Sequence, residues 1–315
     1  MSTDLPQDAT QNDQSGMATN RFSAISIPPR WVAYFELTKP RISTMVLVSI
    51  VVAAVVSSGA TAGFGVLFHV ALGMFLIAAS GNAMNMYLER YSDFLMSRTA
   101  KRPLPDRRLS AQDVTYFAAA TFGVGVGYMA LTLNWQTLAC AVTTWVLYVF
   151  AYTPLKRMTH LNTEVGAVAG ALPIVCGSLA ATGGVEPFGM GLFTMLLFWQ
   201  FPHFMAIAWL YREQYRDGGL KMLTVTEPTG YAAGGKAIVT AVLTGLAGLI
   251  PVFAITNTWA VIVFSMINVV LAAYYLMFSI RFFRSRNDQT ARRLLRYSIL
   301  YLPLYMVLLL VFNRL

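Results

Sequence analysis

Two short acidic patterns in the sequence have the spacing that a metal-binding helix would need. Asn85, Glu89 and Asp93 follow one another at intervals of four residues, so on a helix they would share one slowly drifting face. Glu213 and Asp217 repeat the Glu-x-x-x-Asp spacing later in the chain. Carboxylate and amide oxygens suit Mg2+, which in proteins usually shares its coordination with phosphate oxygens. We therefore expect these five residues to bind Mg2+ and to form the catalytic centre.

Basic side chains lie close to the first acidic pattern. Arg98 and Arg102 follow Asp93 within one loop, and Lys156 lies in the next loop of its kind. Guanidinium groups bind phosphate oxygens in a bidentate fork. Two acidic patterns and a set of cations around one cavity mouth would form a metal–diphosphate site. The alternative is that these are ordinary surface charges that pair with one another in solvent, where such pairs contribute little.

The rest of the chain must hold these residues on helices that cross a membrane. Of the 315 residues, 57% are hydrophobic and only 12% are charged, which excludes an ordinary soluble globular protein. Four long stretches contain no Asp, Glu, Lys or Arg: 42–88, 114–155, 237–280 and 297–313. One further stretch, 165–211, contains a single charged residue, Glu186. A bilayer span needs about 20 apolar residues. The four longest stretches each hold two spans and the fifth holds one, which predicts an all-α polytopic membrane protein with nine transmembrane helices.

Residues that favour turns divide each of the four longest stretches near its middle. They are Gly, Asn, Ser and Pro residues within 57–61, 134–136, 183–187 and 256–258. Such residues stop helices because they adopt turn conformations or compete for backbone hydrogen bonds. We therefore expect one transmembrane helix to end and the next to begin at each of these four positions.

The basic residues also predict how the chain lies in the membrane. Of the 23 Lys and Arg residues, all but Arg314 lie in the N-terminal segment or in the loops 89–113, 156–164, 212–236 and 281–296, which share one side of a nine-span chain. Cytoplasmic loops carry an excess of Lys and Arg. We expect a multi-pass protein of the cell inner membrane with a cytoplasmic N-terminus and the C-terminus on the opposite side. The net charge of +9 then reflects orientation and not a nucleic-acid partner.

The two acidic patterns also suggest an internal repeat. Both follow an even-numbered span, the second and the sixth, at the predicted cytoplasmic end. Spans one to four and five to eight would then be two copies of a four-helix unit, with the ninth span added. The active-site mouth would face the cytoplasm. Residues 1–30 are predicted to be a disordered cytoplasmic tail, because 1–20 are rich in Ser, Thr, Asp, Asn and Gln, and residues 31–315 a single transmembrane domain.

Several longer runs resemble a known family. The first acidic pattern, followed by Met96-Ser97-Arg98-Thr99-Ala100-Lys101-Arg102-Pro103, is similar to the first acidic motif of the intramembrane aromatic prenyltransferases, the UbiA superfamily. Three further runs resemble its haem O synthase branch: Leu37-Thr38-Lys39-Pro40-Arg41, Tyr152-Thr153-Pro154-Leu155-Lys156-Arg157, and Phe198-Trp199-Gln200-Phe201-Pro202-His203-Phe204.

The resemblance implies a prenyltransferase that moves a farnesyl group from farnesyl diphosphate to a vinyl group of haem b. Its partners would be farnesyl diphosphate, haem b as substrate and not as cofactor, the lipid bilayer, and other haem-biosynthesis or oxidase-assembly membrane proteins. Mg2+ would bind with the diphosphate. Beside Arg98, Arg102 and Lys156, Lys39 joins the predicted diphosphate-binding set.

The resemblance also suggests a pocket for haem or for the prenyl chain. Aromatic faces stabilise an allylic cation, and the predicted pocket residues are Tyr152, Trp199, His203 and Tyr215. For His203 two roles stay open. A His inside a span usually forms a hydrogen bond with a neighbouring helix, but it could also contact haem iron or a propionate.

Three positions depart from the pattern that the resemblance implies, and two of them lack a carboxylate. Tyr91 and Gln214 stand where the family usually has Asp, and Glu89 replaces the more usual Asp. The second pattern keeps only Glu213 and Asp217 as carboxylates, so one Mg2+ ion and two ions are both possible. Alternative functions are a related prenyltransferase acting on a quinone precursor or another tetrapyrrole, a transporter, or a non-catalytic assembly factor. A transporter would carry ionisable groups near the bilayer midplane, whereas here the acids gather at one mouth.

Overall fold

The structure is a computed structural model that describes residues 29–313, and within that range every regular element is a helix. Nine helical segments of the described chain are long and apolar enough to cross a membrane, as predicted. They are α2 (Pro40–Ser57), α3 (Phe64–Leu95), α4 (Ala111–Thr132), α5 with η1 and α6 (Trp135–Met158), α7 (Asn162–Thr182), α8 (Pro187–Leu210), α11 with η2 (Tyr231–Ala254), α12 (Thr258–Ser285) and α13 (Asp288–Phe312). The short helices α1 (Arg30–Leu37), α9 (Arg212–Asp217) and α10 (Leu223–Thr226) lie between or before the spans.

The predicted ends of the paired spans are confirmed. The Asn134 side chain accepts from the backbone N–H of Thr137 and so begins α5, and Asn257 accepts from Trp259 and Ala260 to begin α12. Gly183 ends α7 with a φ of 74°, a left-handed conformation that glycine adopts without a steric penalty. The predicted disordered tail falls almost entirely on residues 1–28, which lie outside the described residues. Arg30, its last predicted residue, begins α1.

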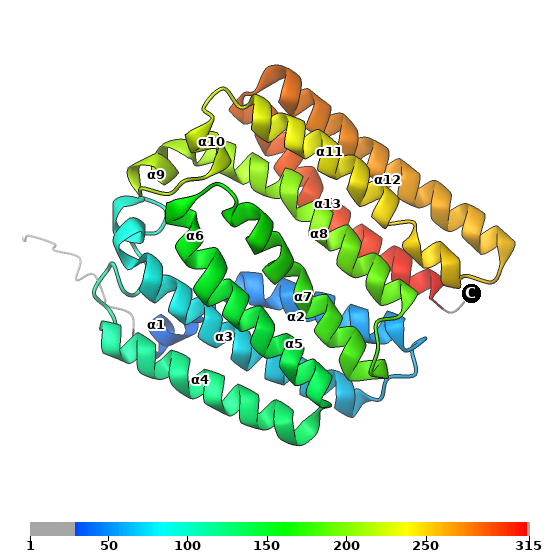
Figure 1. Ribbon diagram of the computed structural model, residues 1–315, viewed down its shortest axis with the longest axis horizontal. Coiled ribbons are helices and arrows are strands. Elements are labelled where there is room, and N and C mark those ends of the chain that lie inside the picture. Colours follow the sequence, from blue (N-terminus) through cyan, green and yellow to red (C-terminus); the bar gives the residue numbers. More distant parts are fainter. Residues whose placement is uncertain (1–28, 314–315) are drawn as a thin grey trace, which may run out of the picture.

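The spans pack side by side, and Figure 1 shows α4 and α12 at opposite edges of the bundle. On one side α3 packs along α4; on the other, α11 packs along both α8 and α12. Between them, α2 packs against α7, and α7 against α8. The helices α3 and α8 are therefore packed between other spans, and both lead into loops at the same end of the bundle. The arrangement as two repeated four-helix units stays a prediction.

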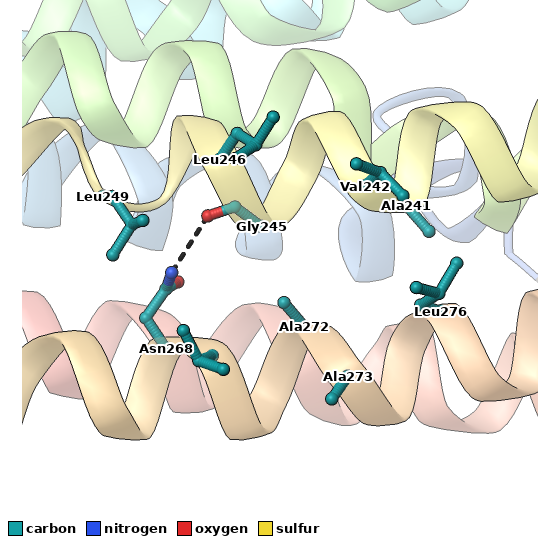
Figure 2. A pocket seen from close by; sticks show the side chains of 10 residues that line it. Ala241, Val242, Gly245, Leu246, Leu249, Asn268, Ala272, Ala273 and Leu276 are labelled. Carbon is teal, nitrogen blue, oxygen red and sulfur yellow. Dashed lines mark hydrogen bonds between the residues drawn. The ribbon is translucent and has the colours of Figure 1, made fainter.

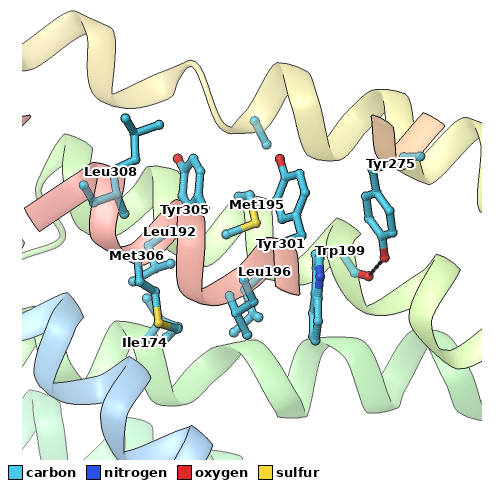
Figure 3. Close-up of a cluster of buried hydrophobic side chains, with 14 of the residues drawn as sticks. Ile174, Leu192, Met195, Leu196, Trp199, Tyr275, Tyr301, Tyr305, Met306 and Leu308 are labelled. Atoms are coloured by element: carbon cyan, nitrogen blue, oxygen red, sulfur yellow. Dashed lines mark hydrogen bonds between the residues drawn. The ribbon is translucent and has the colours of Figure 1, made fainter. Parts of the chain in front are cut away.

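The largest buried cluster lies where α8 meets α11, α12 and α13 (Figure 3). Leu192, Met195 and Trp199 of α8 pack there against Tyr301 and Tyr305 of α13. The hydroxyl of Tyr305 donates to the Gly248 carbonyl at 3.1 Å, so this buried polar group has a partner. Because a buried hydroxyl without a partner is costly, such bonds also fix how neighbouring helices are placed.

The largest departure from regular helix in the span Trp135–Met158 is a π-helical turn. Residues Leu147–Tyr152 form η1, directly before α6 (Thr153–Met158). Pro154 lacks an N–H and its ring crowds the carbonyl four residues earlier, which favours a wider turn at this place. The Tyr148 carbonyl accepts from the backbone N–H of Thr153 and also from the Thr153 hydroxyl, the latter at 2.8 Å. Lys156, the predicted diphosphate ligand, therefore projects from a short helix whose start is fixed by this turn.

A groove with a volume of about 230 Å3 lies between α11 and α12 (Figure 2). Ala241, Gly245, Ala272 and Ala273 line it, so small side chains let the two helices approach closely. The Asn268 side chain donates to the Gly245 carbonyl at 2.9 Å across this gap. The groove is formed by neither acidic pattern, and we regard it as a feature of helix packing.

Gly177 provides a test of how tightly α2 and α7 pack. A Cβ atom at this position would lie 2.3 Å from the backbone carbonyl oxygen of Ile50, an atom that cannot move without shifting α2. We expect Gly177→Ala to lower the free energy of unfolding by about 1–3 kcal/mol, measured as a lower Tm in detergent. Gly123→Ala is the control, because a Cβ there meets nothing within 4 Å. A Tm for Gly177→Ala equal to that of the control would contradict the close approach.

Candidate active site

The first acidic pattern forms one buried face at the loop-bearing end of α3. Asn85, Glu89 and Asp93 are 1%, 7% and 0% exposed, even though they lie in the last three turns of α3, close to the loop that follows it. Their spacing of four residues places them on the same face, as predicted from the helical period. Buried carboxylates are costly unless they are paired or bind a metal.

A basic residue from another element contacts each of these three side chains. Lys39 donates to the Asn85 Oδ1 atom at 2.7 Å. The other two contacts are ion pairs at 2.6 Å: Lys156 with Glu89, and Arg102 with Asp93. We call this group the acidic-face cluster; its members are Lys39, Asn85, Glu89, Asp93, Arg102 and Lys156. Three of the four predicted diphosphate ligands therefore meet the three residues of the first pattern.

Local backbone structure brings the cations to this face. Lys39 precedes Pro40 and has a φ of 48°, an uncommon left-handed conformation for a residue with a side chain. This conformation ends α1 and starts α2 in a tight bend. In the loop that follows α3, the Thr99 hydroxyl donates to the Asp93 carbonyl at 3.0 Å, which folds Arg102 back toward Asp93. Strained backbone at such a position is typical of functional sites.

When Lys39 is protonated, the cluster carries more positive than negative charge. Lys39, Arg102 and Lys156 face only two carboxylates, Glu89 and Asp93. Burial lowers the pKa of the Lys39 ammonium to about 7, and the positive charges of Arg102 and Lys156 act in the same direction, opposed by the two carboxylates. An anion that entered the cluster would relieve this repulsion. The electrostatics therefore favour binding of a negatively charged group such as a diphosphate.

Thr153 fixes the orientation of the Asn85 amide. Its hydroxyl donates to the Tyr148 carbonyl, so it can only accept from Asn85, whose Nδ2 lies 3.1 Å away. The Asn85 Oδ1 atom is consequently turned toward Lys39, where an acceptor is needed. The π-helical turn, which places Thr153, thereby determines which amide atom faces the cluster.

The donor set of the acidic-face cluster fits a magnesium ion. The Oδ1 atom of Asp93 is fully buried and has no hydrogen-bond partner, while Oδ2 pairs with Arg102. A buried carboxylate oxygen without a partner is rare and expensive. Together with the amide oxygen of Asn85 and the carboxylate of Glu89 it offers the hard oxygen ligands that Mg2+ prefers. Among the described residues, no three His, Cys, Asp or Glu side chains gather closely enough to hold a metal without such further ligands.

The second acidic pattern lies on α9, which contacts α3, but outside the cluster. Glu213 is exposed, and Asp217 pairs with its neighbour Arg216 at 3.5 Å with both side chains largely in solvent. Between them, Gln214 accepts from the backbone N–H of Arg98 at 3.2 Å. Gln214 therefore joins α9 to the loop after α3. Its amide oxygen accepts this hydrogen bond without adding the negative charge that an Asp would bring.

Two of the predicted aromatic residues lie beside cations. The ammonium group of Lys156 lies 4.4 Å from the centre of the Tyr152 ring. The guanidinium of Arg98, the fourth predicted diphosphate ligand, lies over the Tyr211 ring and donates to the Tyr215 hydroxyl at 3.3 Å. Cations favour aromatic faces through the ring quadrupole. Arg98 thus approaches α9 and is not among the cations that touch the first pattern.

The other two predicted pocket residues lie at the contact of α8 with α13. The His203 and Trp199 rings stack at 4.9 Å, and both side chains reach Ser298 of α13. His203 Nδ1 lies 2.8 Å from the Ser298 hydroxyl, and Trp199 Nε1 donates to the Ser298 carbonyl at 2.9 Å. One of the two roles considered for His203, a hydrogen bond to a neighbouring helix, is therefore present. A contact with haem stays a prediction.

The sequence pattern of the UbiA prenyltransferase family matches residues 46–307, which include the whole first acidic pattern. The chain belongs to the UbiA prenyltransferase family.

Relatives of this prenyltransferase are similar over most of its length. A Rhodopirellula baltica protein named protoheme IX farnesyltransferase is 41% identical over 274 residues, covering 85% of this chain and 95% of the relative. A Koribacter versatilis protein of the same name is 36% identical, covering 86% and 90%. A mitochondrial protoheme IX farnesyltransferase of Arabidopsis thaliana is 34% identical, with 87% of this chain and 63% of the plant protein covered.

Solved structures of distant relatives share the fold. A digeranylgeranylglyceryl phosphate synthase matches with a TM-score of 0.73 at 16% identity, covering 90% of this chain and 99% of that protein. An Archaeoglobus fulgidus UbiA homologue, whose structure holds GPP and Mg2+, matches with a TM-score of 0.63 at 14% identity, covering 88% and 99%. The helical bundle of this prenyltransferase is therefore the fold of its family.

Sequence reasoning missed three polar residues in or near the acidic-face cluster: Thr153, Ser92 and Gln214. Thr153 was part of a recognised run, but nothing in its type marked it as the partner of Asn85. Ser92 accepts from Arg157 at 3.0 Å, and Gln214 was noted only as a departure from the family pattern. The available signal is position alone: Ser92 adjoins Asp93, and Thr153 lies in the run that carries Lys156.

Replacing Thr153 tests whether the Asn85 orientation matters to this prenyltransferase. In Thr153→Val the Asn85 amide loses its fixed acceptor, so we expect roughly 10- to 100-fold weaker apparent Mg2+ affinity in prenyl diphosphate turnover. Thr153→Ser keeps the hydroxyl and should behave as the wild type. Both variants should have similar Tm values. A Thr153→Val enzyme with the wild-type Mg2+ dependence would contradict the orienting role.

Proposed function

We propose that this chain transfers the farnesyl group of farnesyl diphosphate to a vinyl group of haem b. The observation that carries the proposal is the 41% identity to a protein named protoheme IX farnesyltransferase over 95% of that protein's length. The buried acidic-face cluster supports it, because its excess of cations suits a diphosphate.

The proposed reaction breaks the bond between C1 of the farnesyl chain and the diphosphate oxygen. C1 forms a new bond to the terminal carbon of the vinyl group, and water adds its hydroxyl at the neighbouring carbon while its proton is released. The products are diphosphate and a hydroxyethylfarnesyl haem. The protein must therefore stabilise the leaving diphosphate and keep other water from the allylic cation.

The leaving group would be held by the acidic-face cluster. Lys39, Arg102 and Lys156 would donate to the diphosphate oxygens, and Arg98 would reach them from the side of α9. Asn85, Glu89 and Asp93 would hold the Mg2+ ion. When bound, the ion supplies charge neutralisation for the leaving diphosphate. Because the basic side chains are already held by hydrogen bonds and by their carboxylate partners, little reorganisation is needed when negative charge develops.

The second acidic pattern would complete the diphosphate end. Glu213 and Asp217 are free to turn toward the cluster because both are exposed and α9 lies against α3. We propose that they bind the metal–diphosphate group from the side of α9, opposite the first acidic pattern. One ion shared by both patterns and two separate ions are both compatible with these ligands.

The aromatic residues would receive the organic parts of the substrates. Tyr152 and Tyr215 border the cations and would face the first carbons of the farnesyl chain, where an allylic cation forms. Trp199 and His203 lie deeper along α8 and would contact haem. Within the membrane, we propose the cell inner membrane as the location, with the N-terminus and the active-site mouth in the cytoplasm and the C-terminus outside.

A direct assay tests the acceptor. Purified protein incubated with haem b, farnesyl diphosphate and Mg2+ should yield a farnesylated haem, detected by its mass, and EDTA should stop its formation. A protein that prenylates a hydroxybenzoate but not haem b would be a quinone-pathway enzyme. Folded protein that consumes no farnesyl diphosphate with any acceptor would be an assembly factor or a transporter.

Asp93 tests the diphosphate end independently of the acceptor. Asp93→Asn keeps the shape of the side chain but removes its charge, so turnover should fall roughly 100-fold or more. Asp93→Ala should be as inactive while the protein stays folded. Asp106→Asn is the matched control, since Asp106 is half exposed and pairs with Arg108. Unchanged turnover in Asp93→Asn would remove the role assigned to the first pattern.

A further inference from the structure

The hairpin between α12 and α13 carries basic residues that the proposed reaction does not use. Residues 281–296 contain six Arg and one acidic residue, Asp288. Asp288 is already shared by two guanidiniums, those of Arg212 at 3.0 Å and Arg292 at 3.8 Å. The pair with Arg212 places the hairpin at the same end of the bundle as the loop after α8. This end therefore holds more guanidinium groups than acidic partners.

Two of these arginines line an apolar pocket with their aliphatic stems. A pocket of about 270 Å3 between α12 and α13 is lined by Phe278, Arg293, Arg296, Tyr297 and Leu300. Both arginine side chains are exposed, and neither has an ion pair or hydrogen-bond partner in the described part of the chain. The Tyr297 ring is fixed as a wall, because its hydroxyl donates to the Leu271 carbonyl at 2.8 Å and the ring lies 5.1 Å from that of Phe278.

An apolar stripe begins directly beside these arginines. On α13 the residues Leu300, Leu304, Val307 and Val311 continue the helix face of Arg296 at intervals of three or four, and each is between 42% and 57% exposed. In a membrane-spanning helix such a face lies against the acyl chains of lipids. The arginines then stand at the level of the lipid headgroups, with their aliphatic stems along the apolar wall.

We propose that an anionic phospholipid binds here, with its headgroup phosphate at the rim of this apolar pocket. Arg293 and Arg296 donate to the phosphate oxygens, and an acyl chain lies along the stripe from Leu300 to Val311. Charge complementarity selects the lipid: a net negative headgroup is attracted, whereas the choline of a zwitterionic lipid adds a positive charge beside two guanidiniums. The site is distinct from the acidic-face cluster, which centres on α3. Figure 1 shows α12 at the edge of the bundle opposite α4, the helix that packs along α3.

Native mass spectrometry of the full chain in detergent tests this site. The probes are phosphatidylglycerol and phosphatidylcholine with the same acyl chains. We expect the wild type to bind phosphatidylglycerol about tenfold or more tightly than phosphatidylcholine. In the double variant Arg293→Gln/Arg296→Gln the affinity for phosphatidylglycerol should fall roughly 10- to 30-fold.

The control removes the same charge elsewhere on the hairpin. Arg284→Gln/Arg292→Gln alters two exposed arginines that do not line the pocket, so it should keep the preference for phosphatidylglycerol. Arg293→Lys/Arg296→Lys should keep most of it, which separates loss of charge from loss of fold. Equal loss in the control, or an unchanged preference in the Gln double variant, would overturn the proposal. Binding of phosphatidylglycerol no tighter than that of inorganic phosphate would also overturn it, since the acyl chain would then contribute nothing.

Discussion

The arrangement at the loop-bearing end of the bundle depends on one constraint: two carboxylates buried at the end of α3 must be paired. Glu89 and Asp93 are almost fully buried, and an isolated ionised carboxylate in such surroundings is strongly destabilising. Each has one basic partner at 2.6 Å, Lys156 or Arg102. Those partners come from two other parts of the chain. The need to neutralise α3 thus fixes the loop after it and the short helix α6 in place.

The same pairing explains why the cluster is suited to its proposed substrate. Buried ion pairs contribute little net stability compared with apolar packing, so their presence in an apolar bundle points to function. Removing one member of an ion pair would leave the other as an unpaired buried charge. Replacing that member by another group of the same charge would not. A diphosphate brought with a divalent cation offers both exchanges at once: oxygens for Lys156 and Arg102, and positive charge for Glu89 and Asp93. In the proposed reaction, these cations would hold the site ready for the diphosphate before it binds.

The sequence predicted the parts of this arrangement that follow from local periodicity and composition. Spans and their ends were predictable because Asn134, Asn257 and Gly183 act on their own backbone neighbourhood. The shared face of Asn85, Glu89 and Asp93 follows from the helical period alone. The partners did not follow, since Lys39 and Asn85 are separated by 46 residues and Lys156 and Glu89 by 67. Those contacts depend on how helices cross, and on a π-helical turn that places Thr153.

The two departures from the family pattern that lack a carboxylate, Tyr91 and Gln214, differ in their consequences. Tyr91 lies on the outer side of α3: it is 64% exposed, and the Arg90 guanidinium lies 4.6 Å from its ring centre. A residue there cannot share the buried face of Glu89 and Asp93, so its change from the usual Asp removes no ligand from the acidic-face cluster. Gln214 is different, because it lies on α9 between Glu213 and Asp217 and bonds to the backbone of Arg98. An amide in this place keeps the loop after α3 attached to α9 while adding no negative charge. The three residues of the first acidic pattern therefore keep their buried face without either Asp, and under the proposed function any weakening of metal binding would arise on the α9 side.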